Sequence, residues 1–350
     1  MGQRDWAVVV GIRHYPELGD LNGPENDALA FRDWLVAPNG GAVPQKQIQL
    51  ILSSDFNVPF SSAVNAEPNT QRIQMAFENL QELATANSNK GNGLLVGDRL
   101  YIYMSGHGCA PRFKDAALLT ANATRLRVGY HILGRLFAEW FMRSGYFNQV
   151  LLFMDCCRES FPQATPNIPP YIDVIAPEAI DTAKVFYGFG TKWSHLARER
   201  TINGKSRGVF TVALLAGLNG EACEPDGTIT AASLGDYLYN NMKQFLKAED
   251  LNDPEIAKEP DLEYDANAGK SFVIATVAPP MYPIVIHLPP SAAGKKVEIL
   301  GDKFQAVAST NGVPPAWNVN LPRGMYMAQV LQSDLQTSFD VPGGGNDVNF

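Results

Sequence analysis

Two short stretches of the sequence carry residues that could perform covalent chemistry together. An apolar run at 98–106 leads into His107, which has a glycine on either side, and a second run at 149–155 leads into Cys156 and Cys157. A cysteine thiolate is a strong nucleophile, and histidine is a common general base beside it. Flanking glycines allow tight turns and close backbone approach to a ligand, which packing of His107 alone would not require. The two stretches therefore predict nucleophilic catalysis.

Other roles are open to adjacent cysteines. A buried cysteine is usually core packing, and strand alternation sets Cys156 on the same face as Met154, with Asp155 and Cys157 on the other face. We therefore expect Cys156 to pack in the core. A disulfide between neighbouring cysteines is strained. The spacings typical of metal ligands are missing, so we expect no metal at this site.

The other histidines are less suited to act as the base. His131 is expected to be a structural residue in a helix, and His287 belongs to the C-terminal part of the chain. His195 lies in a predicted loop, and His14 follows the first predicted strand. Only His107 stands between glycines at the tip of an apolar strand, so the base is predicted to be His107.

The elements that must position these residues alternate between strands and helices. This alternation predicts parallel βαβ units, and therefore an α/β fold with a sheet of about six mostly parallel strands and helices on both faces. Sites in such sheets lie at the carboxyl ends of strands, so His107 and Cys157 are expected at the same edge. Strands are predicted at 6–12, 48–52, 98–106, 149–155, 183–190 and 270–276, and helices at 24–36, 69–86, 129–145, 208–220 and 230–247.

The pattern changes near residue 277. Short strand-like pieces separated by Pro, Gly and Asn fill 278–350, without a helical period. We therefore predict two domains: a domain at 1–277 and a small β-sandwich-like accessory domain at 278–350. The polar, acidic stretch 251–270 is expected to be a surface loop. The accessory domain has no recognisable chemistry, so a protein activator or partner bound there is an expectation from architecture alone.

Composition limits the class of protein. The chain has 350 residues, of which 45% are hydrophobic and 18% charged, as in globular proteins of about two domains. A net charge of -8 argues against nucleic acid or anionic membrane as a partner. Four cysteines are too few for a disulfide framework, and neither a signal peptide nor an apolar run of about 20 residues is seen. We expect a soluble, cytoplasmic protein.

The motifs resemble those of caspase-like cysteine peptidases. His107 and Cys157 stand 50 residues apart, close to the spacing in caspases. Within that group the chain is most similar to metacaspases and their bacterial relatives, over about residues 5–276 and without the β domain. The resemblance is carried by WAVVVGIRHYPELGDLNGPENDALAFRDWL, LYIYMSGHG and LLFMDCCRES, and by GVFTVALLAGLNG followed by DGTITAASLGDYL in the small-subunit region.

The resemblance implies a cysteine endopeptidase with roles for particular residues. Cys157 is the nucleophile, His107 is the base and acid, and the backbone N–H groups of Gly108 and Cys157 form the oxyanion hole. Asp27 and Asp155 match the two acidic residues of the metacaspase specificity pocket, whereas the Arg and Gln of Asp-specific caspases are absent. Two carboxylates favour Arg or Lys in the substrate. Alternatively, Asp27 only interacts with the dipole at a helix start.

The resemblance is incomplete after the nucleophile. Metacaspase motifs continue with His-Ser-Gly, whereas Cys157 is followed by Arg158, Glu159 and Ser160. The loop should therefore have another shape, and an inactive caspase-like scaffold that binds a partner through the β domain stays the alternative. An α/β hydrolase is disfavoured because no G-x-S-x-G elbow occurs.

Regulation is expected from two loops. The proline-rich stretch 158–182 and the basic stretch 193–208 lie where relatives have mobile substrate-binding or processing loops. Self-cleavage is predicted within the basic stretch, and a merely solvated loop is the alternative. The resemblance further implies a zymogen in bacterial signalling or defence, with protein or peptide substrates, and it leaves calcium dependence open. The candidate self-cleavage residues are Arg198, Arg200, Lys205 and Arg207.

Overall fold

The chain divides into two compact units in the computed structural model. The larger unit holds residues 1–218 and 230–275, and the smaller one holds 219–229 and 276–350. The smaller unit thus takes in a segment from the middle of the chain as well as the C-terminal stretch. The structure describes residues 2–161, 164–172, 176, 182–265, 269, 271–301, 303–312, 314–343 and 345–350.

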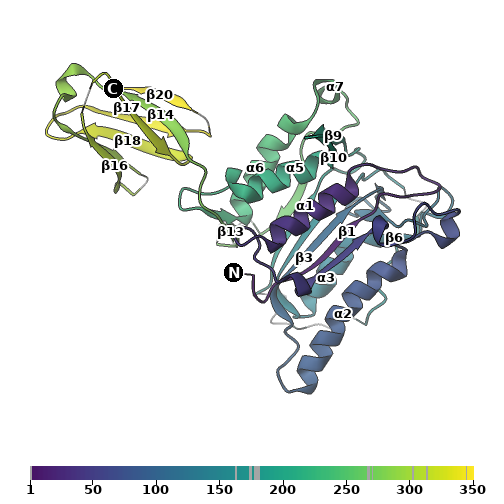
Figure 1. Cartoon of the computed structure of the whole chain (residues 1–350). Coiled ribbons are helices and arrows are strands. Elements are labelled where there is room, and N and C mark those ends of the chain that lie inside the picture. The colour runs from purple at the N-terminus through teal and green to yellow at the C-terminus, as the bar shows by residue number, and fades with distance from the viewer. Residues whose placement is uncertain are drawn as a thin grey trace. The chain divides into compact units, whose positions relative to one another are not determined.

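A six-stranded sheet forms the centre of the larger unit (Figure 1). Its strand order is β12-β8-β7-β3-β1-β2, and every pairing is parallel except that of β12 with β8. This sheet and its helices confirm the predicted α/β fold class. The strands are β1 (Trp6–Gly11), β2 (Ile48–Leu52), β3 (Gly97–Ser105), β7 (Phe147–Asp155), β8 (Lys184–Phe189) and β12 (Asp261–Tyr264).

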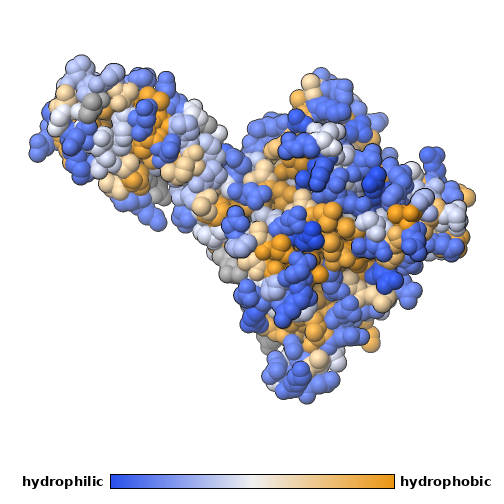
Figure 2. Space-filling view, in the orientation of Figure 1, coloured by the Kyte–Doolittle hydropathy of each residue, from blue (hydrophilic) through white to orange (hydrophobic). Residues whose placement is uncertain are grey.

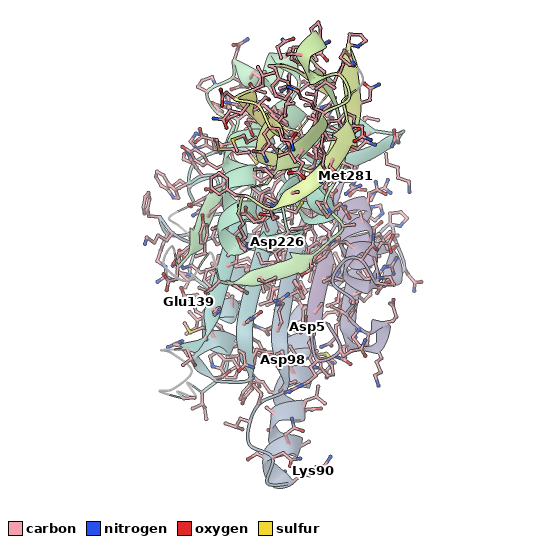
Figure 3. All side chains as sticks on the ribbon, turned by 90° about the vertical axis from the view of Figure 1, so that its left-hand side faces the viewer. Asp5, Lys90, Asp98, Glu139, Asp226 and Met281 are labelled. Atoms are coloured by element: carbon pink, nitrogen blue, oxygen red, sulfur yellow. The ribbon has the colours of Figure 1, made fainter. Side chains whose placement is uncertain are left out.

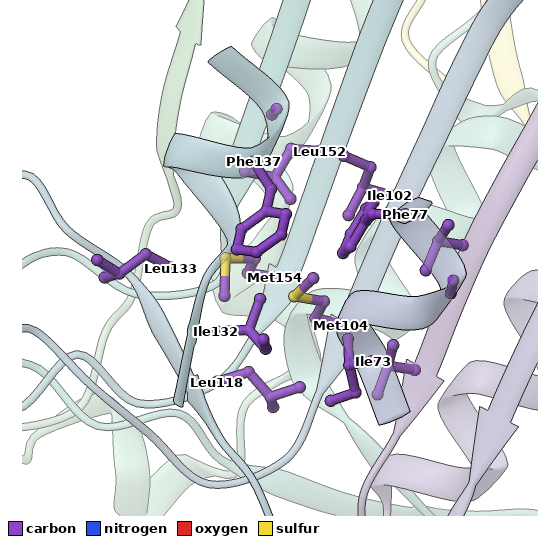
Figure 4. Close-up of a cluster of buried hydrophobic side chains, with 14 of the residues drawn as sticks. Ile73, Phe77, Ile102, Met104, Leu118, Ile132, Leu133, Phe137, Leu152 and Met154 are labelled. Atoms are coloured by element: carbon purple, nitrogen blue, oxygen red, sulfur yellow. The ribbon is translucent and has the colours of Figure 1, made fainter. Parts of the chain in front are cut away.

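Strand alternation divides the side chains of the sheet between two helical layers. On one face, Met104 and Met154 pack in a buried cluster with Phe77 and Phe137 from two helices (Figure 4). On the other face, Tyr103 lies against Phe31 and bonds Thr211 from two further helices. The first layer contains α2 (Thr70–Asn89) and α3 (Gly134–Arg143), and the second contains α1 (Pro24–Val36) and α5 (Val209–Ala216), with α6 (Ala231–Asn241) beside α5.

Local signals in the sequence set where these helices begin. Pro24 occupies the first turn of α1, where its missing N–H has no partner to lose. Asn69 caps α2 by accepting a hydrogen bond from the Arg72 N–H. Thr230 and Ser233 cap α6 reciprocally, each side chain accepting from the backbone N–H of the other. These starts agree with the predicted helices to within one residue.

The sixth strand of the sheet was predicted at the wrong place. The stretch 270–276 instead supplies β13 (Val273–Thr276), which forms a separate two-stranded sheet with β11 (Thr228–Thr230). The sheet is completed by β12, which lies within the stretch predicted to be a surface loop. The charges that suggested a loop have partners, because Asp261 pairs with Arg158 and Glu263 with Arg135.

The environment of His131 was also predicted incorrectly. The helix expected at 129–145 begins only at Gly134, and His131 lies in β6 (His131–Leu133). There β6 extends a three-stranded sheet with β4 (Gly108–Cys109) and β5 (Ala117–Leu119), so backbone pairing overrides the helical pattern. His131 is fully buried and accepts a hydrogen bond from the Asn167 N–H, which fits its expected structural role.

The smaller unit is built from β-strands around its own core. A three-stranded sheet, β17-β14-β20, and a four-stranded sheet, β16-β15-β18-β19, bury residues such as Ile286, Val297 and Val330 in one cluster. This confirms the expected all-β character of the C-terminal part. The strands are β14 (Tyr282–His287), β15 (Lys296–Leu300), β16 (Ala306–Asn311), β17 (Ala316–Leu321), β18 (Gly324–Val330), β19 (Gln336–Val341) and β20 (Asn346–Asn349).

The amino edge of the central sheet is closed by structural contacts. Asp5 and Asp98 lie near each other there, just before β1 and at the start of β3 (Figure 3). The buried Arg99 donates to the Tyr101 hydroxyl and to the carbonyls of 273 and 274. The candidate chemistry is therefore left to the opposite edge.

The surface of the larger unit is mixed. Figure 2 shows hydrophobic residues gathered across the middle of one face, with hydrophilic residues around them. Among the described residues, none of the helices combines the length and apolarity needed to cross a membrane.

The core between the sheet and the helices α2 and α3 should carry much of the stability of the larger unit. Phe137 is buried and lies with its ring centroid 4.7 Å from that of Phe77. We expect Phe137→Ala to lower the free energy of unfolding by about 3–5 kcal/mol, because it removes buried area and leaves a cavity. Urea titration followed by circular dichroism measures this. Leu126→Ala, at a side chain that is 96% exposed, is the control and should change little.

Candidate functional site

His107 and Cys157 leave neighbouring strands at the carboxyl edge of the sheet. The register of β3 and β7 sets Ser105 opposite Asp155, so each candidate residue lies two positions beyond its strand end. The chain places β2 on one side of β1 and β3 on the other, so the topological switch point lies between β1 and β3, next to the strand ends that carry the pair. The structure therefore brings the predicted pair to one edge, at the place where open α/β sheets hold their sites.

Gly108 lies against the backbone of Cys157, the predicted nucleophile. A Cβ on Gly108 would come within 2.5 Å of the Cys157 carbonyl oxygen and 2.7 Å of Cys156 Sγ. No side chain fits that space, so the glycine after the histidine is required by this close approach.

The Gly108 N–H takes no part in the pairing of β4 with β5. Gly108 lies opposite Leu118 in the antiparallel pair of β4 and β5, and the Leu119 N–H donates to the His107 carbonyl. Gly108 and Leu118 therefore form a non-hydrogen-bonded pair, in which the Gly108 N–H points away from β5. On that outer side, the Ala110 N–H donates to the carbonyl of residue 159. The N–H of Gly108 is therefore not paired with β5, and Gly108 itself lies against the Cys157 carbonyl, where an oxyanion-hole donor is predicted.

His107 is oriented by the segment that follows β1. Its Nε2 lies 2.9 Å from the Gly19 carbonyl oxygen, and because a carbonyl only accepts, Nε2 carries the proton. This leaves Nδ1 as the basic nitrogen. The buried Tyr15 packs edge-to-face on the ring, accepts from the His107 N–H and donates to the Leu119 carbonyl. The ring thus has a fixed tautomer and a supported plane.

The Cys157 thiol is held in a resting state. Burial raises its pKa, and the Ala197 N–H, which donates to Sγ at 3.3 Å, opposes that rise only in part. Within the described part of the chain, no hydrogen bond joins Cys157 to His107. The neighbouring Cys156 is 2% exposed and shares the core cluster with Met154, which confirms that Cys156 packs in the core.

The two predicted acidic residues meet beside Gly208. A Cβ at Gly208 would lie 2.1 Å from one Asp155 oxygen and 3.0 Å from one Asp27 oxygen, so both carboxylates border this glycine. Asp155 accepts hydrogen bonds from the N–H and hydroxyl of Thr211. Asp27 accepts from the Gly208 N–H and forms an ion pair with Arg207 at 2.5 Å.

Burial governs the ionisation of this pair. Asp27 and Asp155 are 1% and 6% exposed. Burial, and next the charge of Asp155, raise the pKa of Asp27 well above its usual range. Burial likewise raises the pKa of Asp155, against the hydrogen bonds from Thr211. Two carboxylates that are so little exposed to water are stabilised most by a nearby cation.

The hairpin that supplies Arg207 was not predicted. The stretch expected to be a basic loop contains β9 (Glu199–Ile202) and β10 (Lys205–Gly208), paired antiparallel. The turn signal was present as Asn203-Gly204, both of which have positive φ. The same hairpin brings a third carboxylate, because Glu199 accepts from the Gly23 N–H at the start of α1.

Arg158 explains the departure that follows the nucleophile. Its side chain is 2% exposed and lies over the Phe189 ring at 4.9 Å. The guanidinium donates to the Asp261 carboxylate at 2.6 Å and to the carbonyls of Thr191 and Asp115. Arginine in place of the expected histidine therefore connects the segments around Cys157 rather than extending the reactive site. Within the other predicted loop, 158–182, residues 162–163, 173–175 and 177–181 lie outside the described residues.

The remaining histidines have partners away from the Cys157 thiol. His14 pairs with Asp20 at 2.6 Å, and the His195 ring bonds the carbonyl of residue 193 in its own loop. His287 lies 3.5 Å from Asp347 in the smaller unit. Across the described ranges, no group of three or more His, Cys, Asp or Glu side chains is arranged to hold a metal ion.

Comparison with known proteins identifies relatives of this chain. The family model of the caspase domain matches residues 4–259. A probable protease of a Desulfuromonadales bacterium is 24% identical over 327 residues, a match that covers 85% of this chain but only 37% of that protein. Among solved structures, caspase-1 of Spodoptera frugiperda aligns with a TM-score of 0.46 at 13% identity, over 75% of this chain and 86% of its own. A second solved structure, that of pro-sf-caspase-1, aligns with a TM-score of 0.42, again at 13% identity. This match covers 75% of this chain and 91% of that chain.

The raised pKa of Cys157 predicts slow alkylation at neutral pH. Because the folded protein holds the thiol proton more tightly than a free cysteine, the thiolate should appear only above the ordinary pKa of about 8.5. We expect the rate of reaction with iodoacetamide to rise with pH and to reach its midpoint above that value. Mass spectrometry of the labelled peptide measures the rate. Cys157→Ala is the control, and a midpoint below 8 would contradict the resting state.

Arg158 should be needed for the stability of the loops around the site. Arg158→Met leaves Asp261 and the two carbonyls without their donor, and we expect a loss of about 3 kcal/mol in the free energy of unfolding. Urea denaturation measures it. Arg4→Met is the matched control, because Arg4 is 58% exposed and pairs with Asp98, which is 52% exposed. An equal loss of unfolding free energy in both variants would show that the buried contacts of Arg158 stabilise the fold no more than an exposed ion pair does.

Proposed function

Because this chain belongs to the caspase domain family, we propose that it is a cysteine endopeptidase in which Cys157 attacks and His107 transfers the proton. The observation that carries the proposal is the placement of both residues just beyond adjacent strand ends, with Gly108 packed against the Cys157 carbonyl. The chain spans 37% of the length of its bacterial relative, so activity is proposed for this chain alone.

The proposed reaction proceeds through a thioester. Nδ1 of His107 takes the proton of the Cys157 thiol, and Sγ forms a bond to the scissile carbonyl carbon. The N–H groups of Gly108 and Cys157 stabilise the oxyanion, and each such donor is worth about 10² to 10³ in rate. The C–N bond then breaks as His107 returns the proton to the leaving amine. Water attacks the thioester, with His107 as base, and frees Cys157.

We propose that the enzyme cleaves after Arg or Lys. Asp27 and Asp155 supply two buried carboxylates on the same face of the sheet as Cys157, and an acidic side chain placed among them would be repelled. Asp27 already holds the guanidinium of Arg207, so this region accommodates a basic group. That contact supports the specificity pocket over a mere helix-dipole role for Asp27.

Regulation by activation fits the resting geometry. The thiol is covered by the Ala197 backbone, and among the described residues it forms no hydrogen bond with His107, so some rearrangement must precede catalysis. We propose a zymogen that acts in the cytoplasm, in a bacterial signalling or defence pathway, with a protein activator or partner at the smaller unit. Self-cleavage after Arg198, Arg200, Lys205 or Arg207 stays a prediction, which intact-mass analysis of the active enzyme would test.

The two reactive residues should be indispensable while their buried neighbour is not. We expect Cys157→Ala and His107→Ala each to lower kcat/KM on an Arg or Lys reporter peptide at least about 10³-fold, because each removes a proton-transfer or bond-forming group. Cys156→Ala is the matched control and should keep most of the activity, since Cys156 packs in the core. Assays with and without calcium show whether the ion is needed.

The same assay separates the proposal from its alternative. Cleavage by wild type that survives Cys157→Ala would disprove the assigned nucleophile, and preference for Asp in a peptide library would disprove the basic specificity. No cleavage under any condition, together with retained partner binding, would favour the inactive scaffold.

A further inference from the structure

The guanidinium of Arg207 lies where the proposed function requires a basic side chain of the substrate. Its Nε is 2.5 Å from Asp27 Oδ1, and its side chain is 18% exposed. The backbone directly after it is engaged too, because the Gly208 N–H donates to Asp27 Oδ2. One carboxylate thus binds both the side chain of residue 207 and the next peptide group.

The hairpin that carries Arg207 is fixed to the start of α1. Glu199 accepts from the Gly23 N–H and from the Ser206 hydroxyl, and Asn26 donates to the Ser206 carbonyl. The backbone at residue 207 therefore has little freedom to move away. Only the long side chain of Arg207 can leave Asp27, by rotation about its own bonds.

Little space is left beside the carboxylates. A cavity of about 10 Å³ is bordered by Asp155, Gly190, Ala197 and Phe210, among other residues. That volume holds at most about one water molecule. Both oxygens of Asp27 are already engaged, Oδ1 by Arg207 and Oδ2 by the Gly208 N–H, so a substrate cation can bind Asp27 only in place of Arg207.

The charges nevertheless favour a cation at this place. Asp27, Asp155 and Glu199 bring three carboxylates, whereas Arg198, which borders the small cavity beside Asp155, pairs with acidic residues at 250 and 253. Arg207 also faces a like charge, because the hairpin register sets Arg200 directly opposite it. Arg207 is therefore attracted by one partner and repelled by another, which suits an occupant that can be exchanged.

We propose that Arg207 is a built-in occupant of the cation subsite, and that it competes with the Arg or Lys side chain of the substrate for Asp27. This inference rests on the proposed function of the site. When a substrate cation replaces Arg207, the buried carboxylates keep a partner, so the exchange leaves no uncompensated buried charge. The carboxylates set the preference for basic residues, and Arg207 sets how tightly any of them binds.

The competition predicts a gain of affinity when the occupant is removed. If Arg207 leaves the subsite free about a tenth of the time, a ligand cation binds about tenfold more weakly than it would to an open subsite. Arg207→Gln should therefore bind the ligand cation about tenfold more tightly than wild type. Arg207→Lys keeps a charge but loses the Nε contact with Asp27, so its gain in affinity should be smaller. A residue with only a structural role would give weaker binding when replaced, not tighter binding.

The experiment measures binding of benzamidine, an amidinium probe, by isothermal titration calorimetry to the full chain carrying Cys157→Ala. We expect about tenfold tighter binding with Arg207→Gln and about threefold with Arg207→Lys. Arg200→Gln is the matched control, because it removes the same charge from the opposite position of the hairpin, where Arg200 donates to the Phe245 carbonyl instead of contacting Asp27. It should leave the affinity within about twofold. Thermal unfolding of each variant confirms that it is folded, and Arg207→Lys serves as the test if Arg207→Gln does not fold.

A parallel assay with active enzyme and Arg or Lys reporters distinguishes the outcomes. Unchanged or weaker benzamidine binding by folded Arg207 variants overturns the inference, even where wild type cleaves after Arg or Lys and the proposed function stands. Tighter binding without cleavage by any variant supports the inference and removes the proposed peptidase activity. Benzamidine binding to none of the variants overturns the cation subsite and the inference together. If the inference and the proposed function both hold, Arg207→Gln should lower KM about tenfold. The preference of the enzyme for basic over neutral residues should stay unchanged.

Discussion

The parallel pairing of β3 with β7, in the register that sets Ser105 opposite Asp155, determines everything at the carboxyl edge. Side chains of a strand alternate between its two faces, so this register fixes which helical layer each residue meets. A shift by one residue would turn Cys157 toward the layer of α2 and α3, and would bring Cys156 to the layer of α1 and α5. The large buried side chains of β7 prevent such a shift, because they fill both layers.

The cost of burying charge explains much of the remaining architecture. Asp27, Asp155 and Arg158 are all nearly inaccessible, and each is matched by donors or acceptors from other parts of the chain. Such partners are obligatory, since an unpaired buried charge would cost several kcal/mol. The loops at this edge are therefore held by specific polar contacts instead of by hydrophobic packing. This gives them defined positions while leaving contacts that can be exchanged one at a time.

Much of this could be predicted from the sequence, and the limits have physical causes. The strand ends at His107 and Cys157 are flanked by strong local signals, namely long apolar runs and glycines, and they were predicted correctly. The hairpin carrying Arg207 was missed although Asn203-Gly204 is a typical turn signal, because its strands are short and charged and have no apolar face. The edge strand β12 was missed for a related reason, since its charges have partners only in the folded chain. The role of Arg158 depends on contacts with residues 43 and 103 positions away, which no local pattern contains.

The contacts of the site fit the proposed peptidase with its parts in place but not yet engaged. Ala197 holds the thiol, Gly19 holds the imidazole and Asp27 holds an internal cation. Under the proposed function, a peptide substrate with a basic side chain would replace two of these contacts, with a cation for Asp27 and a reacting carbonyl for the thiol. Each replacement exchanges one favourable interaction for another, so the net driving force is a small difference between large terms. The response of the site would then depend strongly on how firmly the hairpin and the loop carrying Ala197 are held. Control of activity can therefore act through those two segments, without any change in the residues that react.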